Sequence, residues 1–336
     1  MSRPIRVEYP GALFHAFSRG NAKQEIFLWD SDRELFLDLL ATSIEKFRWI
    51  VTSYALMPNH FHLVVELTTE TLSRGMEWLL GEYARRFNRQ HARVGHLFGA
   101  RFKAPLVEKE SYLLELARYV VLNPVRAGLV ERPEQYRWTS HQAVMGQVPA
   151  PKWLAMDTLL QQFAPDREQA RAAYESFVNA AIGRPSELWK NLVAKAYLGS
   201  DEWLRDVRKE VDRKLRSAEH PRAQRLIGAM PMSSIVAVVA KTFCTGEEYV
   251  RRRGDGMPRM VAAWIGRNES LLTNSEIAAG LRMRSSGHVS DIVRRCDREL
   301  DQNPILCRYV HRCISTLRRN EGEPKTWHPT WSRRRA

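Results

Sequence analysis

The alternation of apolar and polar residues in the first 150 positions predicts a small domain that contains a β-sheet. Residues 12–17 alternate as a half-buried strand does, and residues 49–56 and 60–67 are apolar stretches with many β-branched residues. Because only Met57-Pro58-Asn59 separates the last two, we expect them to form a β-hairpin. A fourth strand is expected at residues 101–108.

Helical spacing of apolar residues occupies the gaps between these strands. Residues 33–47 and 71–90 repeat apolar side chains every three or four positions, and a third helix is expected to end at Asn123, because Pro124 follows. The order strand, helix, strand, strand, helix, strand is that of a ferredoxin-like sheet, antiparallel and with helices on one face. We therefore expect residues 1–148 to form an α+β domain with a ferredoxin-like βαββαβ core.

Beyond this domain the pattern predicts helices only. A break at residues 147–151, which contains two prolines, indicates a linker. The charged segment of residues 149–229 has helical periodicity and is expected to be a helical connector. The Arg-rich residues 319–336 are expected to form a basic tail that adds phosphate contacts to DNA.

Residues 230–318 are expected to form an all-α domain. Within it, residues 273–281 and 285–295 are typical of a helix-turn-helix, whose second helix enters the major groove of duplex DNA. The run from Ile235 to Leu317 resembles the C-terminal DNA-binding domain of the replication initiator DnaA, although it departs from that family at Gly287-His288-Val289-Ser290. A plain helical bundle is the alternative. The residues expected to contact DNA here are Ser286, His288 and Ser290 at the start of the second helix, and Arg251, Arg252, Arg253, Arg294 and Arg295 for phosphates.

The charge of the chain points to a polyanionic partner. The 336 residues carry 52 Lys and Arg against 38 Asp and Glu, a formal charge of +14. No apolar run approaches the roughly 20 residues of a membrane-spanning helix, and the N-terminus lacks the apolar core of a signal peptide. We expect no membrane partner and a cytoplasmic, nucleoid-associated protein. The four cysteines lack the spacing of a zinc site and are expected to be buried thiols.

His60 and His62 are the first candidates for chemistry. They flank Phe61 at the start of a predicted strand, where side chains alternate between faces. The two imidazoles are therefore expected on one face, with Phe61 in the core, as half of a metal site. Such a pair by itself is more often structural, so a second motif is needed to favour the metal site.

Tyr119 and Asn123 supply that second motif. They are four residues apart on the third predicted helix and therefore share one face of it. A phenol hydroxyl and an amide oxygen are thus expected to point together at the histidine pair.

These motifs, in this order and at this separation, resemble those of the single-tyrosine HUH transposases. The residues that carry the resemblance are His60-Phe61-His62 after Met57-Pro58-Asn59, and Tyr119 with the run from Asn123 to Gly128. Among these enzymes the first 145 residues most resemble the REP-associated tyrosine transposases.

The resemblance implies a DNA-cleaving and DNA-joining activity. Tyr119 would be the nucleophile, and His60, His62 and Asn123 would bind a divalent metal, Mg²⁺ or Mn²⁺. The implied intermediate is a 5′-phosphotyrosine link with a free 3′-hydroxyl. Partners would be single-stranded hairpins of the repetitive palindromic kind at this domain and duplex DNA at the C-terminal domain. The protein would act as a monomer or a homodimer.

Basic residues on and after the second helix suggest a groove for single-stranded DNA. Phe98 and Phe102 lie among them, as expected where bases stack between phosphate contacts. A solvated helix face is the competing interpretation. The residues expected to bind DNA in this domain are Arg85, Arg86, Arg89, Arg101 and Lys103.

Two other functions are compatible with the motifs. One is a sequence-specific DNA-binding regulator whose nuclease domain is inactive, which the intact histidine and tyrosine motifs disfavour. The other is a replication initiator or relaxase of the same chemistry. A second tyrosine one helical turn from Tyr119 would favour it, and positions 115, 116, 122 and 123 hold none.

Overall fold

The computed structural model describes residues 6–69, 71–192, 196–215, 230–252, 256–270 and 272–319. The chain divides into two compact units, one of residues 8–189 and one of residues 1–7 with 190–336. The boundary between the units, at residues 189 and 190, falls within the predicted connector of residues 149–229, so each unit contains part of that segment. Arg253 and residues 320–336 of the predicted tail lie outside the described residues.

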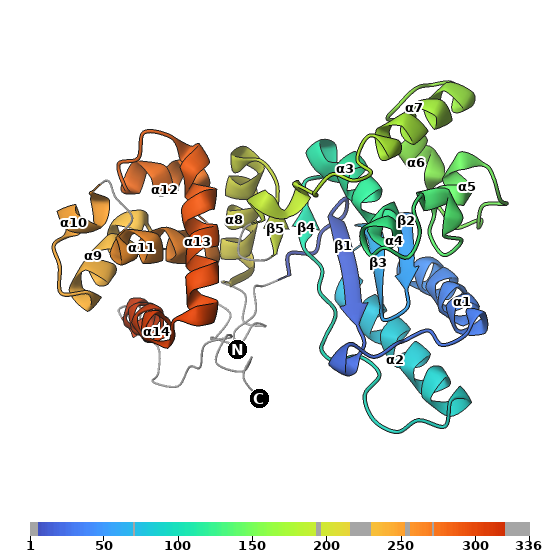
Figure 1. The fold of residues 1–336 in the computed structure, drawn as a ribbon, viewed down its shortest axis with the longest axis horizontal. Coiled ribbons are helices and arrows are strands. Elements are labelled where there is room, and N and C mark those ends of the chain that lie inside the picture. Colours follow the sequence, from blue (N-terminus) through green and yellow to red (C-terminus); the bar gives the residue numbers. More distant parts are fainter. Residues whose placement is uncertain are drawn as a thin grey trace. The chain divides into compact units, whose positions relative to one another are not determined.

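The unit of residues 8–189 is built on an antiparallel sheet with the strand order β2-β3-β1-β4 (Figure 1). This is the predicted ferredoxin-like order, and the predicted hairpin is formed by β2 and β3. The strands are β1 (Leu13–Arg19), β2 (Trp49–Met57), β3 (His60–Leu67) and β4 (Leu106–Val107).

The fourth strand is shorter than predicted. Residues 101–108 run beside β1, where the backbones of Phe17 and Lys103 exchange two hydrogen bonds of 2.8 Å. Pro105 has no N–H to donate, which limits the regular ladder to Leu106–Val107.

Helices cover both faces of the sheet. Helix α1 (Asp30–Phe47) packs against α2 (Leu72–Gln90) over one face, where Phe61 of β3 lies 4.8 Å from Phe36 between ring centroids. Helix α3 (Lys109–Val121) contacts β1, β2 and β3 on the opposite face, toward which His62 projects. The prediction of helices on one face therefore holds for α1 and α2, and the helix that carries the candidate nucleophile lies across the sheet from them.

Helix α3 ends earlier than predicted. Leu122 separates it from the short helix α4 (Asn123–Arg126), which has Pro124 in its first turn, where proline is favoured. Asn123 therefore begins α4 instead of ending α3.

Short helices complete this unit. Tyr174 of α7 is buried and its hydroxyl lies 3.2 Å from Nδ1 of His141 in α5, so the first part of the predicted connector folds with the sheet. The elements are η1 (Asn21–Lys23), η2 (Pro133–Gln135), α5 (His141–Met145), α6 (Met156–Leu160), α7 (Arg167–Asn179) and η3 (Leu188–Asn191).

In its described residues, the other unit is helical apart from one short strand. Helices α9, α11, α13 and α14 pack around one apolar core. The elements are β5 (Tyr197–Leu198), α8 (Asp201–Leu215), α9 (Met232–Thr242), α10 (Glu247–Arg251), α11 (Met257–Glu269), α12 (Asn274–Gly280), η5 (Ser286–His288), α13 (Val289–Gln302) and α14 (Pro304–Arg319).

The predicted helix-turn-helix segment consists of α12, a turn and α13 (Figure 1). The Thr273 hydroxyl accepts a hydrogen bond from the Glu276 N–H, and the Glu276 carboxylate accepts one from the Thr273 N–H, which defines the start of α12. Helix α13 begins at Val289, later than predicted, because Ser286–His288 form a 3₁₀ turn.

The thiols follow the prediction only in part. Cys296 and Cys313 are buried and Cys307 is half-buried, whereas Cys244 is exposed. All four are free. In the parts of the chain that the structure describes, no helix is long and apolar enough to cross a membrane.

Candidate functional site

The two histidines of the predicted metal site lie on one face of β3. Their ring centroids are 4.9 Å apart, and the ring planes are nearly perpendicular, at 85°. His62 is buried, with 5 % of its surface exposed, and His60 is half-buried at the strand end. Phe61 between them is fully buried on the other face, as the alternation of strand side chains requires.

A third histidine, which lies in β1, completes this cluster. His15 pairs across the sheet near His62, and its Nε2 atom lies 2.8 Å from Nδ1 of His62. Burial lowers the pKa of His15 to about 3. It also lowers the pKa of His62 well below its usual value, with smaller contributions from the positive charges of His15, His60 and Arg19. Both rings are therefore neutral at neutral pH, as metal ligands must be.

Tyr119 of α3 faces this cluster from across the sheet surface. Its ring lies edge-on to His62, with 6.1 Å between centroids, and edge-on to His15, with 5.7 Å. The side chain is half-buried. The predicted nucleophile and the predicted ligand His62 thus come together in one site.

Asn123 is held by the end of the helix that carries Tyr119. Its side-chain nitrogen donates to the carbonyl oxygens of Tyr119 at 2.9 Å and Val120 at 3.3 Å. Because both partners are acceptors, the NH₂ group must face them, and the amide oxygen is the atom left for a ligand. Its place in a ligand set with His60 and His62 stays a prediction.

Two arginines near these groups are absent from the sequence-based prediction of the site. The guanidinium of Arg126 lies 5.0 Å from the centroid of the Tyr119 ring and donates to the Tyr119 carbonyl at 2.9 Å. Arg19 is the cross-strand partner of His60 and is exposed. Burial, together with a smaller effect of the Arg19 charge, lowers the pKa of His60 to about 4. The pairing of β1 with β3 places Arg19 opposite His60, so the strand register could have indicated Arg19.

Trp189 of η3 forms a wall of the site. Its ring stacks on His15, with 5.0 Å between centroids and 22° between planes, and lies edge-on to Tyr119 at 5.4 Å. No periodic pattern in the sequence relates Trp189 to His15 or Tyr119.

The residues present fit a divalent metal ion. Nε2 of His62 is buried and has no hydrogen-bond partner among the described residues. Nδ1 of His60 lies 2.6 Å from Oδ1 of Asn59, which leaves Nε2 as the other ring nitrogen. The part of the chain that the structure describes has no group of three or more His, Cys, Asp or Glu residues that could hold a metal. An ion here would therefore depend on two imidazoles, the Asn123 oxygen and oxygen atoms of DNA or water.

The basic residues predicted to bind single-stranded DNA differ in their ion pairs and in their distance from the histidines. Arg85 and Arg86 of α2 both pair with Glu82, the latter at 2.7 Å, whereas Arg89 and Arg101 are exposed. Lys103 is exposed, and its ammonium lies 5.8 Å from the centroid of the Phe17 ring, which is itself 5.7 Å from that of His62. Lys103 is thus the predicted DNA-binding residue that the structure connects with the histidines.

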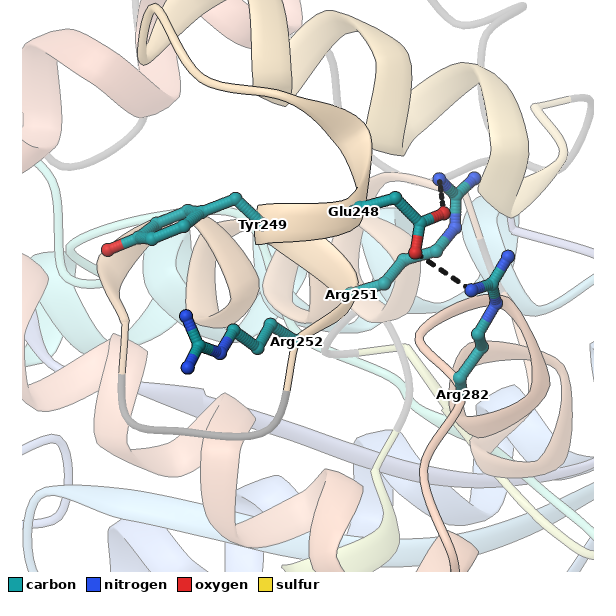
Figure 2. Close-up of a pocket in the computed structure, with 5 residues that line it drawn as sticks. All are labelled: Glu248, Tyr249, Arg251, Arg252 and Arg282. Atoms are coloured by element: carbon teal, nitrogen blue, oxygen red, sulfur yellow. Dashed lines mark hydrogen bonds and ion pairs between the residues drawn. The ribbon is translucent and has the colours of Figure 1, made fainter.

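In the helical unit, a pocket of about 490 Å³ is lined by Arg251, Arg252 and Arg282 with Glu248 and Tyr249 (Figure 2). Arg251 and Arg252 are predicted DNA-binding residues. Arg282 pairs with Glu248 at 2.8 Å, and Arg251 approaches the same carboxylate at 3.9 Å. Arg252 is exposed and extends away from Glu248 in Figure 2. Since Arg251 also pairs with Glu247 at 2.7 Å, the pocket combines two ion-paired arginines with the exposed Arg252.

The predicted base-reading residues lie just before and at the start of α13. Ser286 and His288 belong to the 3₁₀ turn, and Ser290 accepts a hydrogen bond from Asn274 at 3.2 Å. Arg294 pairs with Asp291, and Arg295 is exposed. The DNA contacts of these residues, and the resemblance to DnaA, stay predictions.

The family match among the comparisons with known proteins lies in the sheet-containing unit. Residues 11–123 match the model of a family described as "Transposase IS200 like". This range begins before β1, ends at Asn123, and contains His60, His62 and Tyr119. Among solved structures, the chain is similar to the "Structure of the REP associates tyrosine transposase bound to a REP hairpin", with 14% identity and a TM-score of 0.38 over 46% of this chain and 92% of that one. No curated protein matches the sequence.

Proposed function

We propose that the chain, whose residues 11–123 match the family model of the IS200-like transposases, is a metal-dependent endonuclease and strand transferase for single-stranded DNA. The observation that carries the proposal is the approach of Tyr119 to His62, at 6.1 Å between ring centroids. A phenol on a helix and an imidazole on a strand meet on one side of the sheet, as a nucleophile and a metal ligand must.

In the proposed cleavage step, the hydroxyl oxygen of Tyr119 attacks the scissile phosphorus in line with the 3′-oxygen. A phosphorus–oxygen bond to tyrosine forms as the bond to the 3′-oxygen breaks. The phenol gives up its proton and the leaving 3′-oxygen acquires one, so the products are a 5′-phosphotyrosine and a free 3′-hydroxyl. The reverse attack by a 3′-hydroxyl joins a strand and releases Tyr119, without a nucleotide cofactor.

The residues around Tyr119 have distinct parts in this step. Arg126 places a positive charge beside the phenol ring, where it stabilises negative charge that develops on the oxygen. His60 and His62, with Asn123, would hold the divalent ion. When bound, Mg²⁺ or Mn²⁺ supplies positive charge that polarises the phosphate and stabilises the leaving oxygen.

The proposed substrate is a single-stranded hairpin of the repetitive palindromic type, which follows from the resemblance of the motifs to REP-associated tyrosine transposases. Duplex DNA beside the hairpin is the proposed ligand of the helical unit. Support for that second contact comes from the α12–turn–α13 arrangement and from Arg252, which lines the pocket and is exposed.

The test is cleavage of labelled hairpins taken from repeats in the genome that encodes the protein, with Mn²⁺ or Mg²⁺. The proposed polarity places a 3′-end label in a covalent protein adduct, and leaves a 5′-end label on a free fragment that a polymerase can extend. Adduct formation with the 5′-end label would reverse the polarity, and binding without cleavage of any hairpin would favour an inactive, DNA-binding regulator.

A further inference from the structure

We propose that His15 is a positioning residue, which holds His62 in the tautomer whose Nε2 lone pair is free to bind the metal. The inference rests on the proposed metal site and concerns a residue outside the predicted ligand set. It begins from one contact, the 2.8 Å separation of His15 Nε2 and His62 Nδ1.

One proton lies between His15 Nε2 and His62 Nδ1, and either nitrogen can carry it. Both rings are buried, with 2 % of His15 and 5 % of His62 exposed, so each ring is neutral and carries a single N–H. Either His62 Nδ1 donates to His15 Nε2, or His15 Nε2 donates to His62 Nδ1. The ring planes differ by only 9°, which suits an in-plane hydrogen bond of either kind.

The two positions differ in what they leave at the outer nitrogens. His15 Nδ1 and His62 Nε2 are both buried without hydrogen-bond partners among the described residues. If His62 donates, its Nε2 presents a lone pair, which a metal ion would satisfy, and His15 carries its single N–H on the buried Nδ1. If His15 donates, His62 Nε2 carries a buried N–H that cannot bind a metal ion.

His60 shows how this fold fixes a histidine tautomer by another route. The side-chain nitrogen of Asn59 donates to the Lys23 carbonyl at 3.0 Å, so the NH₂ group of Asn59 is assigned. Its oxygen therefore faces His60 Nδ1 at 2.6 Å, and that nitrogen must carry the proton. His60 Nε2 is left with the lone pair.

By analogy with Asn59, we assign to His15 the role of hydrogen-bond acceptor for Nδ1 of His62. An acceptor on the Nδ1 side of each histidine leaves Nε2 for the metal, and this acceptor is Asn59 for His60 and His15 for His62. Acceptors behind a metal-binding imidazole fix its tautomer and orientation, and their loss typically weakens metal binding about 10–100-fold. Trp189, stacked on His15, restricts the plane of the His15 ring.

Two variants of His15 distinguish the effect of its acceptor atom on metal binding from the effect of its side-chain volume. His15→Gln keeps an acceptor oxygen within reach of His62 Nδ1, whereas His15→Leu fills a similar volume without one. Mn²⁺ binding to the full chain, measured as free Mn²⁺ by electron paramagnetic resonance, should weaken about 10–100-fold in His15→Leu and clearly less in His15→Gln. Equal affinity of His15→Leu and the unmodified protein would overturn the proposal.

A second measurement needs no variant. Long-range ¹H–¹⁵N correlation spectra of the metal-free, histidine-labelled protein distinguish a protonated ring nitrogen from an unprotonated one. The expected result is a proton on His62 Nδ1 and none on Nε2, and a proton on Nε2 would overturn the inference. If the unmodified protein binds no Mn²⁺, the proposed metal chemistry fails, while the proton position still decides the part of His15.

Discussion

Tyr119 lies edge-on to His62, with 6.1 Å between ring centroids and 88° between ring planes. The two residues come from a helix and a strand far apart in the sequence, and α3 brings them together because it packs over the face of the sheet toward which His62 projects.

His60 is expected to be needed for metal-dependent cleavage. His60→Ala removes an imidazole whose Nε2 is left with a lone pair, so the Mn²⁺ concentration that gives half-maximal cleavage should rise by at least tenfold. A metal titration of hairpin cleavage measures this. His96→Ala, which removes an exposed histidine, is the matched control. Identical titrations for the two variants would remove His60 from the ligand set.

Arg19 is expected to contribute a phosphate contact beside His60. It is exposed and aligned with His60 in the sheet, so Arg19→Gln should weaken binding of a single-stranded hairpin. The log–log dependence of affinity on salt should also become shallower, by roughly 0.7 for the lost contact. The control Arg167→Gln removes an exposed arginine of α7, which pairs with Asp157. An unchanged salt slope in Arg19→Gln would exclude the contact.

Acid should destabilise the sheet-containing unit in part through His141. Burial lowers the pKa of His141 to about 4 from 6.5, opposed by the charge of Glu134. Between these pH values the unfolded chain binds a proton that the folded chain does not, so this contribution to stability is fully present above pH 6.5 and is lost as pH falls toward 4.

The variant His141→Gln tests this assignment. It lacks the titrating group, so its free energy of unfolding should depend less on pH in that window, by up to roughly 1.4 kcal/mol per pH unit. Urea unfolding at several pH values provides the measurement. The same slope in both proteins would mean that His141 is already protonated in the fold.

Arg252 is expected to contribute to duplex binding by the helical unit. Since it extends away from Glu248, Arg252→Glu should reduce duplex affinity and lower the salt slope by roughly 0.9 per lost contact, while the cleavage of a short hairpin stays unchanged. Lys209→Glu, an exposed change on α8 of the same unit, is the control. Equal losses in the two variants would indicate a general effect of charge.

The sequence predicted the parts of the site that depend on local periodicity. A strand alternates side chains, so His60 and His62 could be placed on one face. Helical spacing did not reveal that Leu122 separates α3 from α4, which Asn123 begins. The hairpin of β2 and β3 and the ferredoxin-like strand order followed from the same patterns.

The parts that the sequence did not predict depend on contacts between distant segments. The stacking of Trp189 on His15 and the approach of Arg126 to the Tyr119 ring have no periodic pattern. The fourth strand was predicted too long because its apolar composition does not reveal how Pro105 limits the ladder.

The most direct test of the central claim is the identity of the residue that becomes linked to DNA. A hairpin is cleaved with Mn²⁺ by the unmodified protein, by Tyr119→Phe and by Tyr112→Phe, a matched change on the same helix. Adducts are then resolved on a denaturing gel and mapped by mass spectrometry of their peptides. The account predicts an adduct on Tyr119 in the unmodified protein and in Tyr112→Phe, and none in Tyr119→Phe. An adduct that persists in Tyr119→Phe would contradict it.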